Sequence, residues 1–207
     1  MTGLVDYGVG NLFSLASSLE KIGEKATVSA DADFLLSCDR ILLPGVGAFR
    51  DAAEKLFASG LVPALEKAVG EGKPLLGICL GMQLLFEKSE EYGETRGLGF
   101  LKGKVTSIRE RCGERKIPHM GWNALQIVRE HPLLSEVRSG EYVYFVHSFS
   151  AVDCEDSLLA TAEYGAPLTA AVGMKNVMGC QFHPEKSGTV GLSILRAFCK
   201  MKGGTPC

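Results

Sequence analysis

The sequence predicts an α/β protein with an open, mostly parallel central sheet, helices on both faces, and a smaller antiparallel strand region in its second half. In the first half, short apolar runs alternate with longer segments whose apolar residues recur at helical spacing. In the second half, closely spaced runs of alternating apolar and polar residues follow one another. Strand–helix alternation implies right-handed crossovers between parallel strands, and these place helices on both faces of a sheet.

The composition is that of one globular domain spanning 1–207, with a Gly-rich tail at 203–207 that we expect to be mobile. Of the 207 residues, 46% are hydrophobic and 22% charged, and the net charge of −2 gives no general attraction to nucleic acid or anionic membranes. Seven scattered cysteines form no Cys-x-x-Cys pair. We therefore expect a reduced, cytoplasmic protein without a metal or other cofactor.

The apolar pattern assigns the elements in order. Strands are expected at 3–7, 26–29, 40–43 and just before Cys79, with helices at 11–22, 50–58 and 62–71. The polar, Gly-rich stretch 87–99 is expected to be a loop. Later strands are expected at 105–109, 123–128, 142–147, 158–164, 168–173 and 177–182, with a helical turn at 131–134 and a last helix ending near 200. The polar start Met1–Gly3 is expected to fray.

A candidate nucleophile lies where the fourth strand turns into a helix. The segment reads Gly77-Ile78-Cys79-Leu80-Gly81, a Gly-x-Cys-x-Gly elbow. A sharp turn of this kind lifts the central side chain out of the backbone, and glycines on either side remove Cβ atoms that would clash. The first N–H groups of the helix favour a thiolate at Cys79. The alternative is a buried apolar cysteine at a strand end.

A candidate base follows the last predicted strand, in His183-Pro184-Glu185. An extended chain through Pro184 would project His183 and Glu185 to the same side, where the carboxylate could fix the imidazole tautomer. The alternative is a strand-end turn with a solvated glutamate. His131, before a proline in a polar loop, is expected at the surface, while His119 and His147 are left unassigned.

Acyl transfer also needs an oxyanion hole. The backbone N–H of Leu80, directly after the nucleophile, is one expected donor. The strand-end loop Pro44-Gly45-Val46-Gly47 is the best source of a second, because its glycines let the backbone approach and reorient. One such donor typically contributes about 10²–10³-fold to the rate.

Together these motifs resemble the class I (triad) glutamine amidotransferases. The elbow, the Pro44–Gly47 loop before it and His183-Pro184-Glu185 after it occur in the family's order across most of the chain. Further segments resemble one branch of the family, the glutaminase subunits of imidazole glycerol phosphate synthase. These segments are 6–11, 44–49, 118–123, 144–148 and 181–187.

The resemblance implies a role for each matching position. Cys79 would attack the side-chain amide of glutamine, His183 would move the proton, and Glu185 would orient His183. Val46, Gly47 and Leu80 would supply the oxyanion donors. The glutamine substrate would be held by Gly47, Gln83, Glu91, Ser148 and Phe149, the last of which stands where the family pattern has tyrosine.

The resemblance also implies a partner, a (β/α)₈-barrel cyclase that receives the ammonia and uses it in histidine biosynthesis. Asn11, Met120, Trp122 and Lys186 occupy positions expected at the interface with it. Two other interpretations remain: a glutaminase of another pathway, which the 6–11 and 118–123 segments argue against, and a non-catalytic protein with a reactive cysteine, which His183-Pro184-Glu185 argues against.

Overall fold

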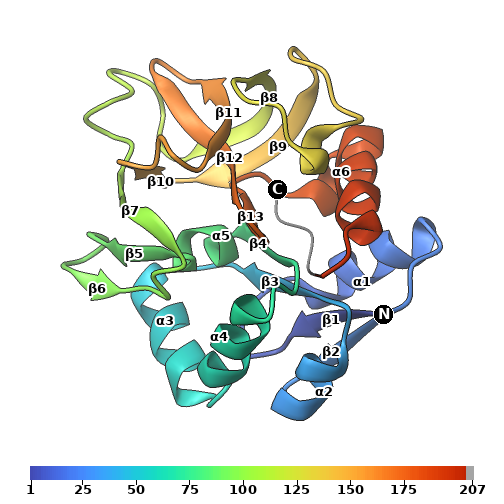
Figure 1. Cartoon of the computed structure of the whole chain (residues 1–207). Coiled ribbons are helices and arrows are strands. Elements are labelled where there is room, and N and C mark those ends of the chain that lie inside the picture. The colour runs from blue at the N-terminus through green and yellow to red at the C-terminus, as the bar shows by residue number, and fades with distance from the viewer. Residues whose placement is uncertain (204–207) are drawn as a thin grey trace.

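The computed structural model describes residues 1–203 as a three-layer α/β structure with a second, smaller sheet (Figure 1). The helices are α1 (Leu12–Lys21), α2 (Ala32–Ser37), α3 (Phe49–Ala58), α4 (Val62–Gly70), α5 (Leu80–Leu84) and α6 (Gly188–Lys200), with 3₁₀ turns η1 (Pro132–Leu134) and η2 (Pro184–Lys186). None of the helices in 1–203 is both long and apolar enough to cross a membrane.

The strands divide between two sheets. They are β1 (Thr2–Val5), β2 (Ala26–Ser29), β3 (Arg40–Gly45), β4 (Leu75–Cys79), β5 (Phe86–Ser89), β6 (Thr95–Arg96), β7 (Leu101–Ser107), β8 (His119–Ile127), β9 (Tyr142–His147), β10 (Phe149–Val152), β11 (Leu158–Glu163), β12 (Pro167–Met174) and β13 (Val177–Cys180). The large sheet has the order β2-β1-β3-β4-β13-β12-β11-β8-β9, and the small one β10-β7-β5-β6.

The large sheet changes direction at β13. Strands β2, β1, β3, β4 and β13 run parallel, and β12, β11, β8 and β9 continue the sheet in antiparallel fashion. The α/β fold class is thus confirmed. The antiparallel strands extend the main sheet, however, and the separate small sheet contains one parallel pair, β5 with β7.

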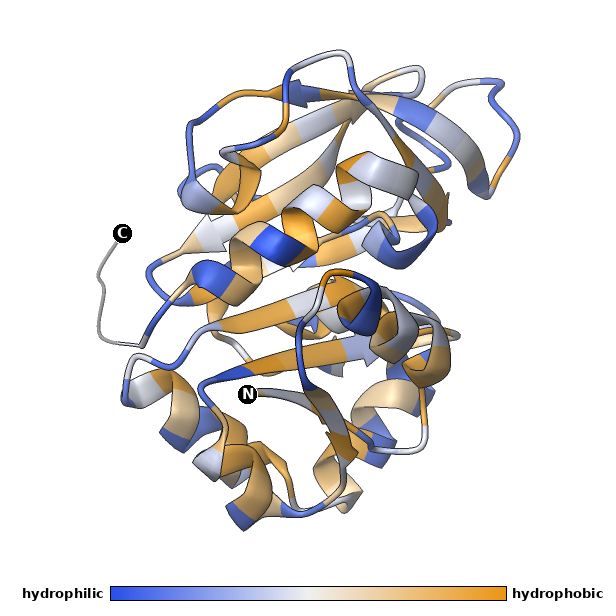
Figure 2. Cartoon of the chain, turned by 90° about the vertical axis from the view of Figure 1, so that its right-hand side faces the viewer, coloured by the Kyte–Doolittle hydropathy of each residue, from blue (hydrophilic) through white to orange (hydrophobic). Residues whose placement is uncertain are grey.

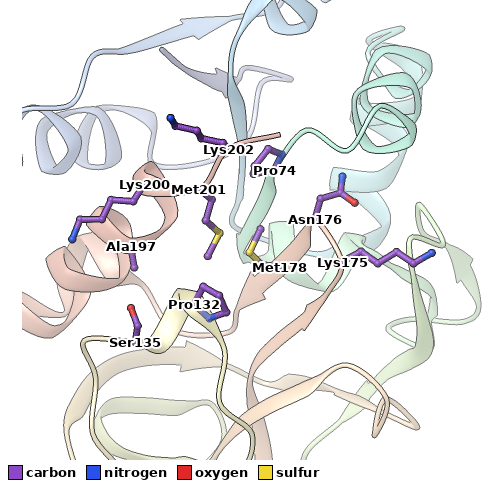
Figure 3. Close-up of a pocket in the computed structure, with 10 residues that line it drawn as sticks. All are labelled: Pro74, Pro132, Ser135, Lys175, Asn176, Met178, Ala197, Lys200, Met201 and Lys202. Carbon is purple, nitrogen blue, oxygen red and sulfur yellow. The ribbon is translucent and has the colours of Figure 1, made fainter. Parts of the chain in front are cut away.

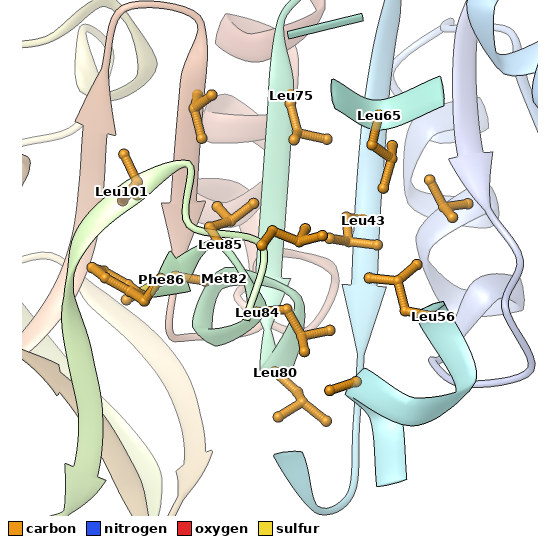
Figure 4. Packing of buried hydrophobic residues seen from close by; sticks show 14 of the residues in the cluster. Leu43, Leu56, Leu65, Leu75, Leu80, Met82, Leu84, Leu85, Phe86 and Leu101 are labelled. Carbon is orange, nitrogen blue, oxygen red and sulfur yellow. The ribbon is translucent and has the colours of Figure 1, made fainter. Parts of the chain in front are cut away.

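Alternation along the central strands divides the core into two layers. Ile41, Leu43 and Leu75 face the layer that includes α2, α3, α4 and α5 (Figure 4), whereas Leu42 and Leu76 face the layer that includes α1 and α6. Figure 2 shows the same pattern, with apolar residues concentrated on the central strands and polar ones outside. Burial on both faces explains why these strands read as continuous apolar runs.

Several elements differ from the sequence-based expectation. The stretch 87–99 contains most of β5 and all of β6, because β5 pairs with β7 and β6 pairs with β5, which orders polar residues that carry no local strand signal. Helix α2 and strand β10 were also missed. Met1–Gly3 does not fray: Thr2 is buried, β1 pairs with β2 and β3, and the Met1 amino group pairs with Asp39.

The strand order places the predicted catalytic residues at one edge of the large sheet. Strands β3 and β4 are neighbours, with Gly45 in register with Cys79, and β13 lies on the other side of β4. The Pro44–Gly47 segment and Cys79 lie at the ends of β3 and β4, and His183 follows β13 by three residues. Parallel strands therefore place all three at their carboxyl ends, where ligands bind in open α/β sheets. The predicted mobile tail 203–207 lies outside the described residues except for Gly203.

Candidate active site

Cys79 is the last residue of β4 and the N-cap of α5. Its backbone angles are φ 56° and ψ −111°, in the positive-φ region that residues with a side chain rarely adopt. The residue is buried, with 7% of its surface exposed. The strained turn is the elbow that the Gly-x-Cys-x-Gly pattern predicts, and its side chain contributes to a cavity described below.

The two flanking glycines of the elbow are required by packing. A Cβ on Gly81 would lie 1.8 Å from the carbonyl oxygen of Leu43, and a Cβ on Gly77 would lie 2.6 Å from that of Gly81. Both contacts are with backbone atoms that cannot move independently. The elbow can therefore form beside β3 only with glycine at both positions.

His183 and Glu185 form a buried pair at the end of β13. The imidazole Nδ1 donates to Glu185 Oε1 at 2.8 Å, and both side chains are 3% exposed. The backbone does not stay extended through Pro184, as the sequence suggested, but turns into the 3₁₀ turn η2. The pair forms all the same, because residues two apart can meet across a tight turn. The solvated-glutamate alternative is wrong, since Glu185 is buried.

Ser187 is a supporting residue that sequence reasoning missed. Its hydroxyl donates to the carbonyl oxygen of His183 at 2.6 Å and accepts from the N–H of Tyr144 at 3.0 Å. The N–H of His183 in turn donates to the carbonyl oxygen of Tyr144 at 2.9 Å. These bonds fasten the backbone of His183 to β9, so the position of the imidazole is fixed from both sides.

The electrostatics of His183 favour a charged imidazole. Burial is the largest effect and lowers its pKa, but the interactions with Cys79 and Glu185 outweigh it and raise the pKa to about 10. The Nε2 atom is buried and has no hydrogen-bond partner within 1–203. The arrangement is a cysteine beside an imidazole that is protonated at neutral pH and held by a carboxylate, which is the organisation of an activated nucleophile.

A cavity of about 330 Å³ opens at this edge of the sheet. It collects the predicted oxyanion residues, the predicted substrate residues and both Cys79 and His183, although their sequence positions span most of the chain. Its lining residues are Val46, Gly47, Cys79, Leu80, Gln83, Glu91, Pro118, Val146, His147, Ser148, Phe149 and His183. Pro118, Val146 and His147 were not predicted as site residues.

Two of the predicted substrate residues also have structural partners. Gln83 Nε2 donates to the carbonyl oxygen of Phe149 at 3.0 Å and to Gln181 Oε1 at 2.9 Å. Glu91 Oε2 accepts from the N–H of Phe49 at 2.7 Å and thereby caps α3, whose own N-cap, Ala48, has no capping side chain. Burial raises the pKa of Glu91. Gln83 thus keeps its amide oxygen, and Glu91 its second carboxylate oxygen, as acceptors for a ligand.

The Pro44–Gly47 segment is rigid at one end and open at the other. A Cβ on Gly45 would lie 2.8 Å from both the N–H nitrogen of Gly81 and the hydroxyl of Tyr7, and that hydroxyl donates to the carbonyl oxygen of Pro44 at 2.9 Å. Gly47, in contrast, has φ +97° and no atom within 4 Å of an added Cβ. The backbone at Gly47 therefore has open space beside it, whereas the backbone at Gly45 is closely packed.

The residues expected at a partner interface lie on the surface near this edge. Met120 and Trp122, on the same face of β8, are 62% and 55% exposed, so Trp122 is not a core residue. Tyr144 lies between Trp122 and Lys186, with its ring centroid 6.1 Å from that of Trp122 and 5.7 Å from Lys186 Nζ. Asn11 caps α1 by accepting from the N–H of Ser14. Phe13, 83% exposed, is a further apolar residue beside Asn11 that sequence reasoning did not assign.

The structure also places the other three histidines and several of the cysteines. His131 is not a surface residue: it is half-buried and caps η1, where Nδ1 accepts from the N–H of Leu133 at 3.1 Å. His119 and His147 are both buried. Cys38, Cys180 and Cys199 are buried, as expected of packing residues, and Cys207 lies outside the described residues.

A second cavity, of about 370 Å³, lies at the opposite end of β4 and β13 (Figure 3). Its lining includes Pro74 and Asn176, which precede these strands, and Met201, which follows α6. Asn176 Nδ2 donates to the carbonyl oxygens of Val69 and Lys73. The lining contains lysines but no cysteine, histidine or carboxylate. Its one hydroxyl, of Ser135, has no histidine or carboxylate in the lining to act as its base, so we assign the catalytic site to the cavity at Cys79.

Comparison with known sequences gives full-length relatives. The model of the class-I glutamine amidotransferase family matches residues 3–201. A Bacillus licheniformis protein named imidazole glycerol phosphate synthase subunit HisH is 54% identical over 203 residues, covering 96% of this chain and 95% of the relative. Proteins of the same name from Bacillus subtilis and Wolinella succinogenes are each 50% identical, covering 97% of this chain and 96% and 100% of the relatives.

Comparison with solved structures supports the fold. A crystal structure described as a glutamine amidotransferase superposes with a TM-score of 0.75 at 20% identity, covering 96% of this chain and 97% of that one. A chain of PurLQS from Thermotoga maritima gives a TM-score of 0.71 at 22% identity, with 96% of each chain covered. With the match of the family model and the identity of about 50% to full-length relatives, the chain belongs to the class-I glutamine amidotransferase family.

Proposed function

We propose that this chain is the glutaminase subunit of an imidazole glycerol phosphate synthase, which hydrolyses L-glutamine to glutamate and supplies the ammonia to a cyclase partner. The observation that carries the proposal is the meeting of Cys79, His183 and Glu185 at the cavity where the carboxyl ends of β4 and β13 lie side by side. Relatives that share about half of its residues bear the name of this synthase subunit.

In the proposed mechanism, the Cys79 thiolate attacks the side-chain amide carbon of glutamine. Protonated His183 gives its proton to the amide nitrogen, the C–N bond breaks, and ammonia leaves a glutamyl thioester on Cys79. Neutral His183 then takes a proton from water, whose oxygen attacks the thioester and releases glutamate. Glu185, through Nδ1 of His183, holds the imidazole with Nε2 toward the thiol in both steps.

The oxyanion of both tetrahedral intermediates is proposed to bind to backbone N–H groups of Leu80 and of the Val46–Gly47 segment. Leu80 begins α5 and is fixed by the elbow. Gly45 is the last residue of β3 and is in register with Cys79 of β4, so a change in donor geometry is proposed for Val46 and Gly47, which follow the strand. A partner that biases the orientation of this segment would regulate the rate, since one donor contributes about 10²–10³-fold.

Glutamine is proposed to lie between this segment and the wall formed by Ser148 and Phe149. Glu91 lines the cavity and uses one carboxylate oxygen on α3, so we assign its other oxygen to the ammonium group of the substrate. Gln83 uses its amide nitrogen on Phe149 and Gln181, which leaves its oxygen as the acceptor for substrate N–H groups. Phe149 contributes backbone and ring, so the hydroxyl of the family's tyrosine is not part of this scheme.

The proposed partner is a (β/α)₈-barrel cyclase that docks on the carboxyl edge of the sheet. Asn11, Met120, Trp122 and Lys186 are proposed contacts, and the exposed Trp122 beside Tyr144 is the anchor. Ammonia released at Cys79 would pass to the cyclase for histidine biosynthesis. The six cysteines within 1–203 are all free and buried, which fits the reducing cytoplasm where we propose that this step occurs.

The proposal is tested by labelling the complex of this chain and its cyclase with a chloroketone analogue of glutamine. We expect rapid modification of the peptide that contains Cys79, with glutamine slowing the reaction in proportion to its occupancy. A Cys38→Ala variant, which removes a buried thiol outside the cavity, should label like the wild type. Labelling of Cys79 that glutamine does not slow would favour the reactive-cysteine alternative and contradict the proposal.

A further inference from the structure

Two buried histidines that the mechanism does not use, His119 and His147, support the cavity wall formed by residues 146–149. His119 and His147 face each other across the antiparallel pair β8–β9, and their rings approach with His119 Nδ1 2.9 Å from His147 Nε2. The exposed fractions of the two residues are 2% and 6%. His119 stacks between Phe145 and Tyr164, at centroid distances of 4.7 Å and 4.1 Å. His147 alone reaches the cavity.

The hydrogen bonds around the pair allow one arrangement of protons. Asn123 Oδ1 accepts from the N–H of Ala124, so the amide nitrogen of Asn123 is the group that donates to the carbonyl oxygen of Glu163 at 2.8 Å. The same nitrogen lies 3.2 Å from His119 Nε2, which must therefore be an acceptor. His119 then carries its proton on Nδ1 and donates to His147 Nε2. His147 in turn carries its proton on Nδ1.

This series of hydrogen bonds ends at a backbone carbonyl group of the cavity wall. His147 Nδ1 donates to the carbonyl oxygen of Phe149 at 2.8 Å, and the same oxygen accepts from Gln83 Nε2 at 3.0 Å. Gln83 lies in α5, the helix that Cys79 begins, and its nitrogen also reaches Gln181. Gln181 Nε2 lies 3.9 Å from Cys79 Sγ, so the wall and the nucleophile are joined through buried amides.

Both imidazoles are neutral in this arrangement. Burial lowers the pKa of His119 to about 4 and, as the largest of several effects, lowers that of His147 to about 3. A second proton on either ring would face a donor instead of an acceptor. Neither histidine therefore serves as a base for the thiol, a role that the His183–Glu185 pair fills. The donor direction, from Asn123 to Phe149, is fixed by the protein.

We infer that His119 and His147 are positioning residues for glutamine binding, which hold the 146–149 wall at the correct distance from Cys79 by delivering one directed hydrogen bond to the Phe149 carbonyl. His147 acts on the wall directly, and His119 acts through His147 by dictating its tautomer. Without the donor on His119 Nδ1, His147 can move its proton to Nε2, and the bond to Phe149 is lost. This inference rests on the proposed glutaminase function of the cavity.

Two substitutions at His119 separate this role from simple packing. The side-chain amide nitrogen of asparagine can take the position of the imidazole Nδ1, whereas that of glutamine takes the position of Nε2. His119→Asn therefore keeps the hydrogen-bond donor to His147, and His119→Gln removes it. In the complex with the cyclase, we expect His119→Gln to raise the KM for glutamine about 10-fold, equivalent to about 1.4 kcal/mol. His119→Asn should stay within about 3-fold of the wild type, and kcat should change less than KM in both.

Packing alone predicts the opposite order, because asparagine leaves the larger void between Phe145 and Tyr164. Equal KM values for the two variants, or a worse KM for His119→Asn, would overturn the inference. His131→Asn, in a cap outside the cavity, is the matched control and should leave KM unchanged. Failure of the proposed function would look different: the wild-type complex itself would then show no glutamine-dependent turnover.

A measurement on the wild type covers the case in which a variant does not fold. The ¹⁵N chemical shifts of the imidazole nitrogens report which one carries the proton. We expect both His119 and His147 to be protonated at Nδ1 and unprotonated at Nε2 near neutral pH. Either histidine protonated at Nε2 would overturn the inference directly.

Discussion

At the scale of single residues, the site depends on close approach of backbones and not on unusual side chains. The strained Cys79 is tolerated because Gly77 and Gly81 let the elbow pack against β3. Tyr7 adds a hydroxyl that holds the carbonyl group of Pro44. The Gly-x-Cys-x-Gly spacing was enough to predict the elbow, but nothing local to Tyr7 indicated a contact with a segment 37 positions away.

The close approach at Gly81 predicts a large cost for adding one methyl group. Gly81→Ala would place a Cβ 1.8 Å from the carbonyl oxygen of Leu43, so we expect a loss of about 3 kcal/mol or more in the free energy of unfolding. Gly70→Ala, in α4 with no neighbouring atom within 4 Å, is the matched control and should be neutral or slightly stabilising. Urea unfolding monitored by circular dichroism measures both, and equal stabilities would contradict the packing argument.

The Tyr7 hydroxyl predicts a catalytic effect at a residue outside the cavity. Tyr7→Phe removes the bond to the Pro44 carbonyl while keeping the ring, and should cost about 1 kcal/mol of stability. Because the same carbonyl anchors the Pro44–Gly47 segment, which we propose to supply an oxyanion donor, we expect kcat for glutamine hydrolysis to fall several-fold with little change in KM. Steady-state kinetics of the complex check this, and a change confined to KM would argue against an effect on the oxyanion segment.

At the scale of elements, contacts with segments distant in sequence determine secondary structure that the local sequence pattern does not predict. The 87–99 stretch has the composition of a loop, yet β5 pairs with β7 and Glu91 caps α3. The helical turn at η1 and the strand β9 were predicted correctly because proline and alternating apolar residues are local signals. The turn η2 was not, and the His183–Glu185 contact was reached by a different geometry from the one expected.

The β8–β9 pair predicts a pH dependence of stability. The pKa values of His119 and His147 are lowered by folding to about 4 and about 3, with His183 and Arg111 adding to burial at His147. Their contribution is thus fully present above pH 6.5 and is lost as the pH falls toward 4, by up to about 1.4 kcal/mol per pH unit for each histidine. Urea unfolding of the wild type and of His119→Asn from pH 7 to 4 measures it. The variant should show the shallower loss, and parallel curves would contradict the assignment.

At the scale of the whole molecule, the order of strands in the large sheet creates the site. Strand β13 comes last in the chain but inserts beside β4, so Cys79 and His183 meet at one edge while the antiparallel strands carry His147, Ser148 and Trp122 to the same region (Figure 1). The sequence predicted the parallel half and its carboxyl edge. It did not predict that the antiparallel strands continue the same sheet, because strand order depends on pairing between distant segments.

Because Trp122 is exposed at this edge, we expect its substitution to change the affinity for the cyclase and not the stability of the fold. Trp122→Ala should weaken the affinity for the cyclase at least about 10-fold, as expected for a buried anchor in an interface. Because the side chain is 55% exposed in the free chain, the free energy of unfolding should change by no more than about 0.5 kcal/mol. Phe57→Ala, at the far end of α3, is the control. Titration calorimetry with the cyclase measures the affinities, and an unchanged Kd for Trp122→Ala would remove it from the interface.

The central claim is a division of labour, in which this chain generates ammonia at Cys79 and the cyclase consumes it. The most direct measurement is product formation by the complex of Cys79→Ala with the cyclase, supplied in parallel with glutamine or with ammonium salt. The account predicts that glutamine no longer supports the reaction, while ammonium supports it at the wild-type rate. Turnover of glutamine by the variant, or loss of the ammonium-dependent reaction as well, would contradict it.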